Sequence, residues 1–411
     1  MTNKSNFYGL GIAPNILAVL DKLNFKIPTP IQEKSIPSAI EGKDLLGLAQ
    51  TGTGKTLAFG IPMIQAALQG KHGLVILPTR ELALQVEQIL HKIGGASSLG
   101  VRTALLIGGE SMYRQLQALR RNPTIILGTP GRMIDHLQQK TLSLKGIKIL
   151  VLDEADRMLD MGFAPQLKQI LTTVPRERQT MLFSATMPNE IIHLAHSYMK
   201  LPLRIEIAPS GTTSAKVTQE LFFISKPDKP RLLEKLLSEY HGSILIFSRT
   251  KFGAKKIAAG VRALKHTVTE LHSNKSLGQR REALDGFKNG KYRVLVATDI
   301  ASRGIDVKGI ELVLNYDLPD NAEDYIHRIG RTARAGAAGN AISFATPDQR
   351  GDVRNIERLM RAALPLRKLP ELPPARMATE YHPQRHSFRP SRPSKFQRAG
   401  AWNSHKIKFR S

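Results

Sequence analysis

The sequence predicts an α/β protein made of two tandem, doubly wound parallel-sheet domains. Short apolar runs alternate with amphipathic helical stretches along most of the chain, which is typical of buried parallel strands joined by crossover helices. The helical period is lost once, after Leu201, where small and polar residues follow. With 411 residues the chain is also too long for one ordinary core. We therefore expect domains at 1–207 and 218–364, joined by a linker at 208–217.

The first predicted domain begins its sheet with the apolar run Leu45–Leu48. Five later runs have the composition of buried strands: "GLVILPT", "TALLIGG", "TIILGTP", "KILVLDEAD" and "QTMLFSAT". Between them, stretches such as "RELALQVEQIL" place Leu82, Val86 and Ile89 on one helical face. The second predicted domain repeats the alternation with "ELFFIS", "SILIFSRT", "YRVLVATD", "ELVLNYDLP" and "NAISFATP".

Residues 365–411 have a composition that predicts a disordered basic tail. They contain seven prolines and eleven Lys or Arg, against two acids. Five aromatic residues lie among the cations: Tyr381, Phe388, Phe396, Trp402 and Phe409. Cations hold a nucleic-acid backbone and rings stack on bases, so an RNA-binding extension is expected. A tail that only keeps the protein in solution is the alternative.

The overall charge indicates a polyanionic partner. Sixty Lys and Arg against 34 Asp and Glu give a formal charge of +26, and nucleic acid is the first candidate. A membrane surface is the second, but the sequence has neither an 18-residue apolar span nor a long basic amphipathic helix. No cleavable leader pattern follows the N-terminus, which favours a cytoplasmic protein. The absence of cysteine excludes disulfides, thiolate metal sites and thiol catalysis.

The stretch "AQTGTGKT" predicts a phosphate-binding loop. Gly52 and Gly54 allow the tight turn whose backbone N–H groups surround a phosphate. Lys55 would reach the β and γ phosphates, and the Thr56 hydroxyl would bind Mg²⁺. The first loop position holds Ala49 instead of glycine. This position only begins the loop, so we expect it to accommodate the methyl group of alanine. The loop by itself leaves a kinase, a GTPase and a helicase open.

Two carboxylates follow the apolar run in "KILVLDEAD". Asp153 and Glu154 come at the carboxyl end of the expected strand, the edge at which parallel sheets bind ligands. Asp153 suits Mg²⁺, and Glu154 suits a base that orients the attacking water. In "HRIGRTAR", Arg331 and Arg334 are three residues apart and would project to one side, where both could hold a phosphate.

Seven motifs together resemble those of the DEAD-box RNA helicases: "AQTGTGKT", "PTRELA", "TPGR", "DEAD", "SAT", "ATDIASRGID" and "HRIGRTAR". Their order and spacing match from about Phe7 to Pro347. The short core with a basic tail is similar to the bacterial RhlE-like group. The resemblance implies two RecA-like domains, ATP and Mg²⁺ as ligands, and local, non-processive, ATP-dependent unwinding or remodelling of RNA duplexes and RNA–protein complexes.

The resemblance also implies an ATP site shared by both domains. Gln32 in "FKIPTPIQ" would read the adenine edge, with Phe25 and Phe7 packed around the base. Asp306 would hold the ribose, and Arg331 and Arg334 would act as arginine fingers on the γ-phosphate. The segment Ser184, Ala185 and Thr186, together with His327, would couple the state of ATP to RNA. The full expected ATP-binding set is Phe25, Gln32, Ala49, Gln50, Thr51, Gly52, Thr53, Gly54, Lys55, Thr56, Asp306, Arg331 and Arg334.

RNA contacts implied by the resemblance suit a phosphate backbone, because they are hydroxyls, guanidinium groups and a glycine. They are Thr79, Arg80, Gly109, Thr129, Arg132, Thr250, Arg280 and Thr298. Binding is then independent of base sequence. Single strands and short duplexes are the expected partners, with ribosome-assembly or RNA-decay factors as possible protein partners and a monomer as the expected state.

The chain departs from the family pattern in two ways that bear on the site. Ala333 replaces a usual glycine, and "HSNKSLGQR" lacks the glycine after His272 and has Leu277 where glutamine is common. Two other activities stay open: an ATP-gated clamp that holds RNA without separating strands, and a DNA translocase.

Overall fold

The computed structural model describes residues 6–50, 52–95, 98–207, 217–299, 307, 309–333 and 339–374. Both sheets belong to one compact unit that spans Met1–Pro373. Within the described residues, no helix is long and apolar enough to cross a membrane.

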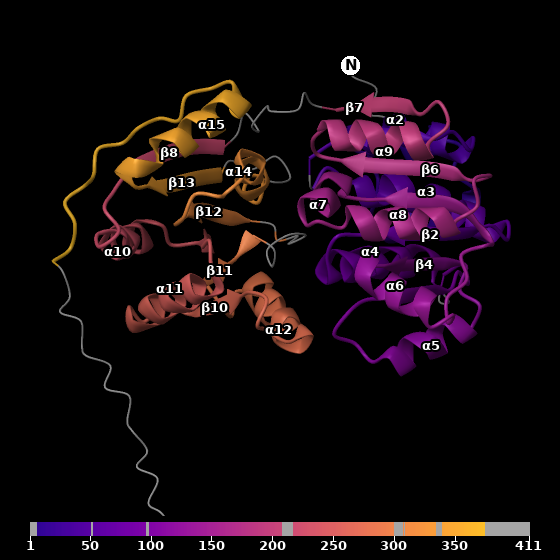
Figure 1. Ribbon diagram of the computed structural model, residues 1–411, viewed down its shortest axis with the longest axis horizontal. Helices are drawn as coiled ribbons and strands as arrows, with labels where there is room; N and C mark the ends of the chain where they lie inside the picture. Colours follow the sequence, from indigo (N-terminus) through magenta and orange to yellow (C-terminus); the bar gives the residue numbers. More distant parts are fainter. Residues whose placement is uncertain are drawn as a thin grey trace, which may run out of the picture. The chain divides into compact units, whose positions relative to one another are not determined.

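The first domain contains a parallel sheet of seven strands in the order β3-β4-β2-β5-β6-β1-β7 (Figure 1). Its strands are β1 (Leu45–Leu48), β2 (His72–Ile76), β3 (Thr103–Leu106), β4 (Ile125–Gly128), β5 (Ile147–Leu152), β6 (Gln179–Ser184) and β7 (Leu203–Glu206). Six of them are the predicted strands. We did not predict β7, because only Ile205 of its four residues is buried and the apolar pattern is therefore too weak to mark a strand.

Helices cover both faces of this sheet, as a doubly wound fold requires. Alternate strand residues form separate cores: Leu45, Val75 and Val151 face one, while Leu46, Ile76 and Leu152 face the other. The first face is covered by η1 (Phe7–Gly9), α1 (Pro14–Lys22), α2 (Pro30–Ile40), α3 (Lys55–Leu68) and α4 (Arg80–Gly94). The second is covered by α6 (Pro130–Gln138), α7 (Ala155–Asp160), α8 (Ala164–Thr173) and α9 (Asn189–Tyr198), while α5 (Met112–Arg120) packs beside β3 (Figure 1).

The second domain has a parallel sheet of six strands in the order β10-β11-β9-β12-β13-β8. The strands are β8 (Val217–Phe223), β9 (Ser243–Phe247), β10 (Val268–Leu271), β11 (Val294–Ala297), β12 (Ile310–Asn315) and β13 (Gly339–Ala345). One face packs on α10 (Lys229–Glu239) and α11 (Lys251–Ala263). The other packs on α12 (Leu277–Lys288), α14 (Ala322–Ile329) and α15 (Arg350–Met360), with η3 (Pro347–Gln349) just before α15. The predicted two-domain, parallel α/β fold is confirmed.

The structure moves two predicted boundaries. β8 already begins at Val217, which the prediction assigned to the linker, and the rest of the linker, 208–216, lies outside the described residues. The predicted tail begins too early at 365. Leu221 N donates to Pro365 O and Arg367 N donates to Leu221 O, both at 2.9 Å, so this segment extends the edge of the second sheet beside β8. Hydrogen bonds between backbone groups at a sheet edge leave no pattern in the sequence. The prolines of this segment also resemble those of the tail, so the sequence does not separate the two. The aromatic residues predicted for the tail lie beyond the described part.

Candidate functional site

The sheet order of each domain divides the predicted site residues into two groups. In the first domain the predicted phosphate loop, the two carboxylates and the "SAT" segment follow or end β1, β5 and β6, which are neighbours, whereas Phe25 and Gln32 come before β1. The predicted RNA residues follow β2, β3 and β4, which are also neighbours. In the second domain the predicted RNA contacts come after β9, β10 and β11, again adjacent, and His327 and Arg331 come after β12. The residues that directly follow a strand lie at the carboxyl edge of the sheet, where parallel sheets bind ligands. The topology thus places most of the predicted nucleotide residues and the predicted RNA residues on different halves of each sheet edge.

The phosphate loop connects β1 to α3. Gly52 (φ +86°) and Gly54 (φ +93°) adopt left-handed conformations that other residues take only with strain. A Cβ on Gly54 would also clash with the Gln32 amide. Lys55 and Thr56 are the first residues of α3, whose N-terminal N–H groups favour an anion. Thr53 Oγ1 donates to Gln50 O at 2.7 Å, which closes the loop.

Lys55 has the environment of a phosphate ligand. Its side chain is 6% exposed, and its Nζ has no hydrogen-bond partner among the described residues. The nearest carboxylate oxygen is Asp153 Oδ1 at 4.0 Å, an ion pair too long for a hydrogen bond. A buried ammonium without a hydrogen bond is costly, so the pocket is complementary to an anionic oxygen.

The two predicted carboxylates differ in their electrostatics. Asp153 ends its strand in a fully buried position, and burial raises its pKa to about 6 even though Lys55 opposes the shift. Burial would also raise the pKa of Glu154, but Arg157, Lys55 and Arg331 outweigh it and hold that pKa below its usual value. A carboxylate with a lowered pKa keeps its charge at neutral pH and is a weak base. Glu154 is thus better suited to orienting a water molecule than to storing its proton.

Glu154 also carries backbone strain, since its φ of +52° is in the left-handed region. It lies at the N-cap of α7, and Glu154 N donates to Asp153 Oδ1 at 3.0 Å. Arg157, one turn along α7, donates from Nη1 to Glu154 Oε2 at 3.3 Å. The turn and this contact hold the acid at the end of β5.

One cation of the second domain acts on the same acid. Arg331, which is 2% exposed, donates from Nε to His327 O at 3.3 Å, and its charge stabilises the ionised form of Glu154. His327 is itself buried, and burial followed by the Arg157 charge keeps its pKa well below its usual value. It is therefore neutral at physiological pH.

Two buried arginines in this region were not selected from the sequence. Arg157 is described above. Arg328 donates from Nε and Nη2 to both Asp299 oxygens at 2.6 Å, and from Nη1 to Asn315 Oδ1 at 3.0 Å; its guanidinium also lies 4.9 Å from the Phe247 ring centroid. The hydrogen bonds fix α14 to Asp299, which follows β11, and to the end of β12, while the ring contact joins it to the end of β9. The sequence does contain a signal for Arg328, because Arg328, Arg331 and Arg334 are spaced three residues apart. We predicted a role only for the last two.

The segment "SAT" contacts the DEAD residues through its second and third members. Asp156 Oδ2 accepts hydrogen bonds from Ala185 N, Thr186 N and Thr186 Oγ1 at 3.0, 2.9 and 3.0 Å. Ser184 Oγ, in contrast, has no hydrogen-bond partner among the described residues. Ser184 instead joins the phosphate loop through its backbone, because its carbonyl accepts from Ala49 N at 3.0 Å.

Gln32 connects the predicted adenine segment to the phosphate loop. Its Oε1 accepts from Thr29 N and its Nε2 donates to Gly54 O, both at 2.9 Å, while the side chain is 3% exposed. Each bond uses one of two lone pairs or one of two N–H groups, so one of each is left for a base edge. Phe25 is 37% exposed, as a base-packing ring would be, whereas Phe7 is buried in the core.

Six of the eight predicted RNA contacts line one groove of about 550 Å³: Thr79, Arg80, Gly109, Thr129, Arg132 and Arg280. Thr79 and Thr250 each cap a helix. Their Oγ1 atoms accept from Leu82 N at 3.3 Å and Gly253 N at 3.0 Å. A capping hydroxyl still has its O–H to donate, so these threonines can serve a phosphate at the N-termini of α4 and α11. Thr250 and Thr298 do not line the groove; Thr298 directly follows β11.

The arginines of the groove are held by their surroundings. Arg80 lies against Gly108 and Gly109, where any Cβ would clash with its guanidinium, and Arg132 donates to Glu110 O at 3.1 Å. Arg280 Nε donates to Glu81 Oε1 at 2.5 Å, although the two residues are 199 positions apart. The guanidinium of Arg280 is thus engaged by a carboxylate next to Arg80.

Three predicted residues, Thr51, Asp306 and Arg334, lie outside the described residues. Ala333 adopts φ +52°, which explains why glycine is usual there. A left-handed residue with a side chain costs roughly 1–2 kcal/mol. Alanine in place of the usual glycine therefore carries a backbone cost at this position, although both residues are small.

Comparison with known proteins agrees with this geometry. Residues 29–194 match the DEAD/DEAH box helicase family, and residues 228–336 match the helicase conserved C-terminal domain. An ATP-dependent rRNA helicase RRP3 of Debaryomyces hansenii is 42% identical over 88% of this chain and 76% of its own. A DEAD-box ATP-dependent RNA helicase CshA of Bacillus cereus is 40% identical over 90% of this chain and 70% of its own.

A solved structure of S. cerevisiae Dbp5 bound to RNA and ADP BeF3 has a TM-score of 0.80 at 29% identity and covers 89% of this chain and 95% of its own. None of these comparisons tests the narrower RhlE-like assignment. The relatives' identity, the two domain matches and the arrangement of the motifs agree, and the chain belongs to the DEAD-box family of ATP-dependent RNA helicases.

Proposed function

We propose that this helicase unwinds short RNA duplexes locally and non-processively, with ATP bound between its domains and RNA in the groove beside it. The observation that supports the proposal most directly is the environment of Glu154. Lys55 and Arg157 of the first domain and Arg331 of the second all stabilise the same carboxylate. A water-orienting acid that depends on groups from both domains links hydrolysis to domain closure.

Mg²⁺ would be held by Asp153 and the Thr56 hydroxyl, which are hard oxygen ligands suited to that ion. When bound with ATP, it would neutralise charge on the phosphate oxygens. The residues fit a metal ion bound together with phosphate, because Asp153 offers a buried carboxylate beside the phosphate loop, and Lys55 Nζ, 4.0 Å from Asp153 Oδ1 and without a hydrogen-bond partner in the described structure, would meet the phosphate. Gln32 would contact the adenine edge, with Arg331 on the γ-phosphate.

RNA would be recognised through its backbone, since the predicted contacts that line the groove are hydroxyls, guanidinium groups and a glycine, which suit phosphates. The RNA and ADP BeF3 bound by Dbp5 support such a pairing of ligands in this chain. The rRNA helicase names of the RRP3 relatives favour ribosome assembly as one setting, and RNA decay is a second. Cytoplasmic location and a monomeric state remain predictions.

Arg132→Gln tests the groove. We expect the RNA concentration for half-maximal ATPase stimulation to rise about tenfold, because a charged hydrogen bond contributes roughly 1.5–3 kcal/mol. The maximal rate and the RNA-free rate should stay unchanged. The measurement is an ATPase titration with RNA and, in parallel, with DNA of the same sequence. Arg176→Gln, on an exposed loop of the same domain, is the matched control. Equal half-maximal RNA concentrations for Arg132→Gln and Arg176→Gln would exclude RNA binding in the groove. Equal stimulation of the ATPase by RNA and DNA would favour a translocase on DNA.

The clamp alternative is separated from the helicase by strand displacement. A labelled duplex with a competitor strand should be separated faster with ATP than without it if the enzyme unwinds. ATP-dependent retention on a single strand, with no separation beyond passive trapping, would favour the clamp.

Deletion of the basic tail is expected to weaken RNA binding and reduce its salt dependence, while the RNA-free ATPase rate stays the same. The structure places the cut after Pro374, because Arg231 Nε donates to Pro373 O at 2.6 Å and Leu372 packs on the second core. Salt-titrated binding of full-length and truncated chains provides the measurement. An unchanged affinity and salt slope would leave the tail as a solubilising segment only.

A further inference from the structure

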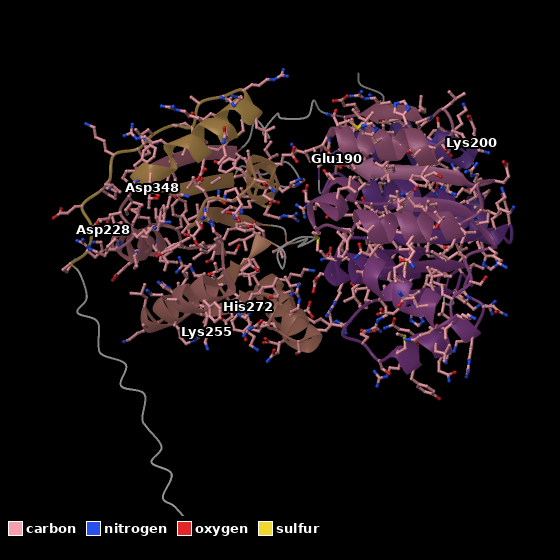
Figure 2. The ribbon with its side chains drawn as sticks, in the orientation of Figure 1. Glu190, Lys200, Asp228, Lys255, His272 and Asp348 are labelled. Carbon is pink, nitrogen blue, oxygen red and sulfur yellow. The ribbon has the colours of Figure 1, made fainter. Side chains whose placement is uncertain are left out.

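Helix α11 presents an exposed basic surface that no part of the ATP site or the groove uses. Its sequence, "KFGAKKIAAGVRA", contains four cations and no acid. Ala254, Ile257, Ala258 and Val261 are buried, which leaves Lys255, Lys256 and Arg262 on the solvent side (Figure 2 labels Lys255). Hereafter the α11 surface means Lys251, Phe252, Lys255, Lys256 and Arg262.

Three cations of this surface lack the ion pairs that several other cations of the same domain form. Lys229 pairs with Asp317 at 3.1 Å, Arg231 with Asp228 at 2.8 Å and Lys291 with Glu282 at 2.8 Å. In contrast, Lys255, Lys256 and Arg262 form no ion pair with any described residue. Three unpaired cations on one helix repel one another, and a bound polyanion would remove that repulsion.

Phe252 is an unusual member of this surface, because its side chain is 74% exposed beside the helix N-terminus. Lys251 Nζ lies 5.3 Å from its ring centroid. An exposed ring among cations is the pairing that single-stranded nucleic acid uses, with phosphates on the cations and a base stacked on the ring. The exposed side also carries Gly260, where a Cβ would meet no atom within 4 Å, so a backbone can approach closely.

The surface is continuous with the groove. Lys251 Nζ donates to Asn274 Oδ1 at 3.2 Å, and the neighbours of Asn274, Ser273 and Lys275, line the groove. Thr250, a predicted RNA contact, caps the same helix. From Lys251 to Arg262 the helix rises about 16 Å, a length that spans roughly four or five phosphates of a helical strand.

We propose that the α11 surface binds the RNA backbone beyond the groove, with Phe252 stacked on a base of the extending strand. The inference rests on the proposed RNA groove and adds a second segment to it. It assigns RNA affinity to the second domain itself, separately from the tail, and predicts that RNAs longer than the groove bind more tightly.

The test compares two triple variants with equal loss of charge in the full chain. One is K255Q/K256Q/R262Q. The control is K288Q/R354Q/K368Q, whose residues are also exposed and form no ion pair with any described residue. Each is titrated by salt-dependent binding with two RNAs: the shortest single strand that gives full ATPase stimulation, and that strand extended at its 5′ or 3′ end.

We expect the α11 variant to bind the extended strand more weakly, with the slope of log K against log salt reduced by roughly 2 for three lost phosphate contacts. Its affinity for the shortest strand and the stimulation by that strand should match wild type. F252L should weaken binding of the extended strand about fivefold or more. An equal change in the control, or an equal loss with both strands, would overturn the proposal. If the proposed groove does not bind RNA, the Arg132→Gln variant will instead bind the shortest strand as tightly as wild type does.

Discussion

Arg331→Ala is expected to lower the RNA-stimulated ATPase rate by about 10³- to 10⁵-fold, the effect of removing an arginine finger. The side chain is 2% exposed and acts on Glu154 from the second domain. Its loss removes charge stabilisation that is needed only when the γ-phosphate leaves, so kcat should fall much more than ATP affinity. Single-turnover hydrolysis with saturating RNA measures the chemical step directly.

Arg331→Lys separates charge from geometry. Lysine keeps the charge but lacks the planar fork, so we expect it to recover only a small part of the rate. Arg358→Ala, on the exposed side of α15, is the control for loss of one arginine from this domain. Because Arg331 is buried, the thermal midpoint of each variant must be compared with that of wild type. A folded Arg331→Ala variant with more than a tenth of the wild-type rate would exclude the finger role.

The sequence was sufficient to predict the strands that are buried on both faces. Such strands read as continuous apolar runs, as β5 and β6 do, and turn residues separate them. β7 and the 365–367 extension are edge segments, where one side is exposed and the stabilisation comes from backbone hydrogen bonds. Composition contains little information about that kind of pairing. This explains why β7 was not predicted and why the tail was predicted to begin too early.

The local parts of the site could be predicted for a similar reason. The loop from Gly52 to Thr56 needs residues with particular backbone freedom and chemistry at adjacent positions, and adjacent positions are visible in a sequence. Contacts between distant segments are not. Neither the bond from Gln32 to Gly54 O nor the pairing of Arg280 with Glu81 leaves a spacing that could be recognised.

Side chains that act through other residues were also missed. Arg157 was passed over because a cation after "DEAD" resembles an exposed helix residue, yet it is 2% exposed and contacts Glu154. Its role depends on burial, which the six-residue helix α7 is too short to reveal by periodicity. The strand order adds information that the sequence pattern lacks, because it places most of the predicted nucleotide residues and the predicted RNA residues on separate halves of each sheet edge.

Glu154→Gln is expected to reduce the ATPase rate by about 10²- to 10⁴-fold, the usual contribution of a positioned acid or base. Glutamine keeps the size of the side chain, so ATP and RNA should still bind. Lys55→Ala is the contrasting variant, since it removes the buried ammonium of the phosphate loop and should weaken ATP binding itself. Equilibrium binding of a fluorescent ATP analogue, measured beside steady-state hydrolysis, distinguishes the two effects.

The electrostatics of Glu154 predict a second effect of the same variant. Its pKa is below the usual value in the folded protein, so the ionised carboxylate stabilises the fold above the unfolded pKa, and that stability is lost as pH falls through the folded value. At pH 7 wild type has this contribution and Glu154→Gln does not, because Arg157 and Lys55 then face a neutral amide. We therefore expect a lower thermal midpoint for the variant at pH 7 and a smaller difference from wild type at acidic pH. If Glu154→Gln keeps full hydrolysis, the water-orienting role is excluded. If it loses hydrolysis while its thermal midpoint stays unchanged, the acid acts on water without stabilising the fold through the cations around it.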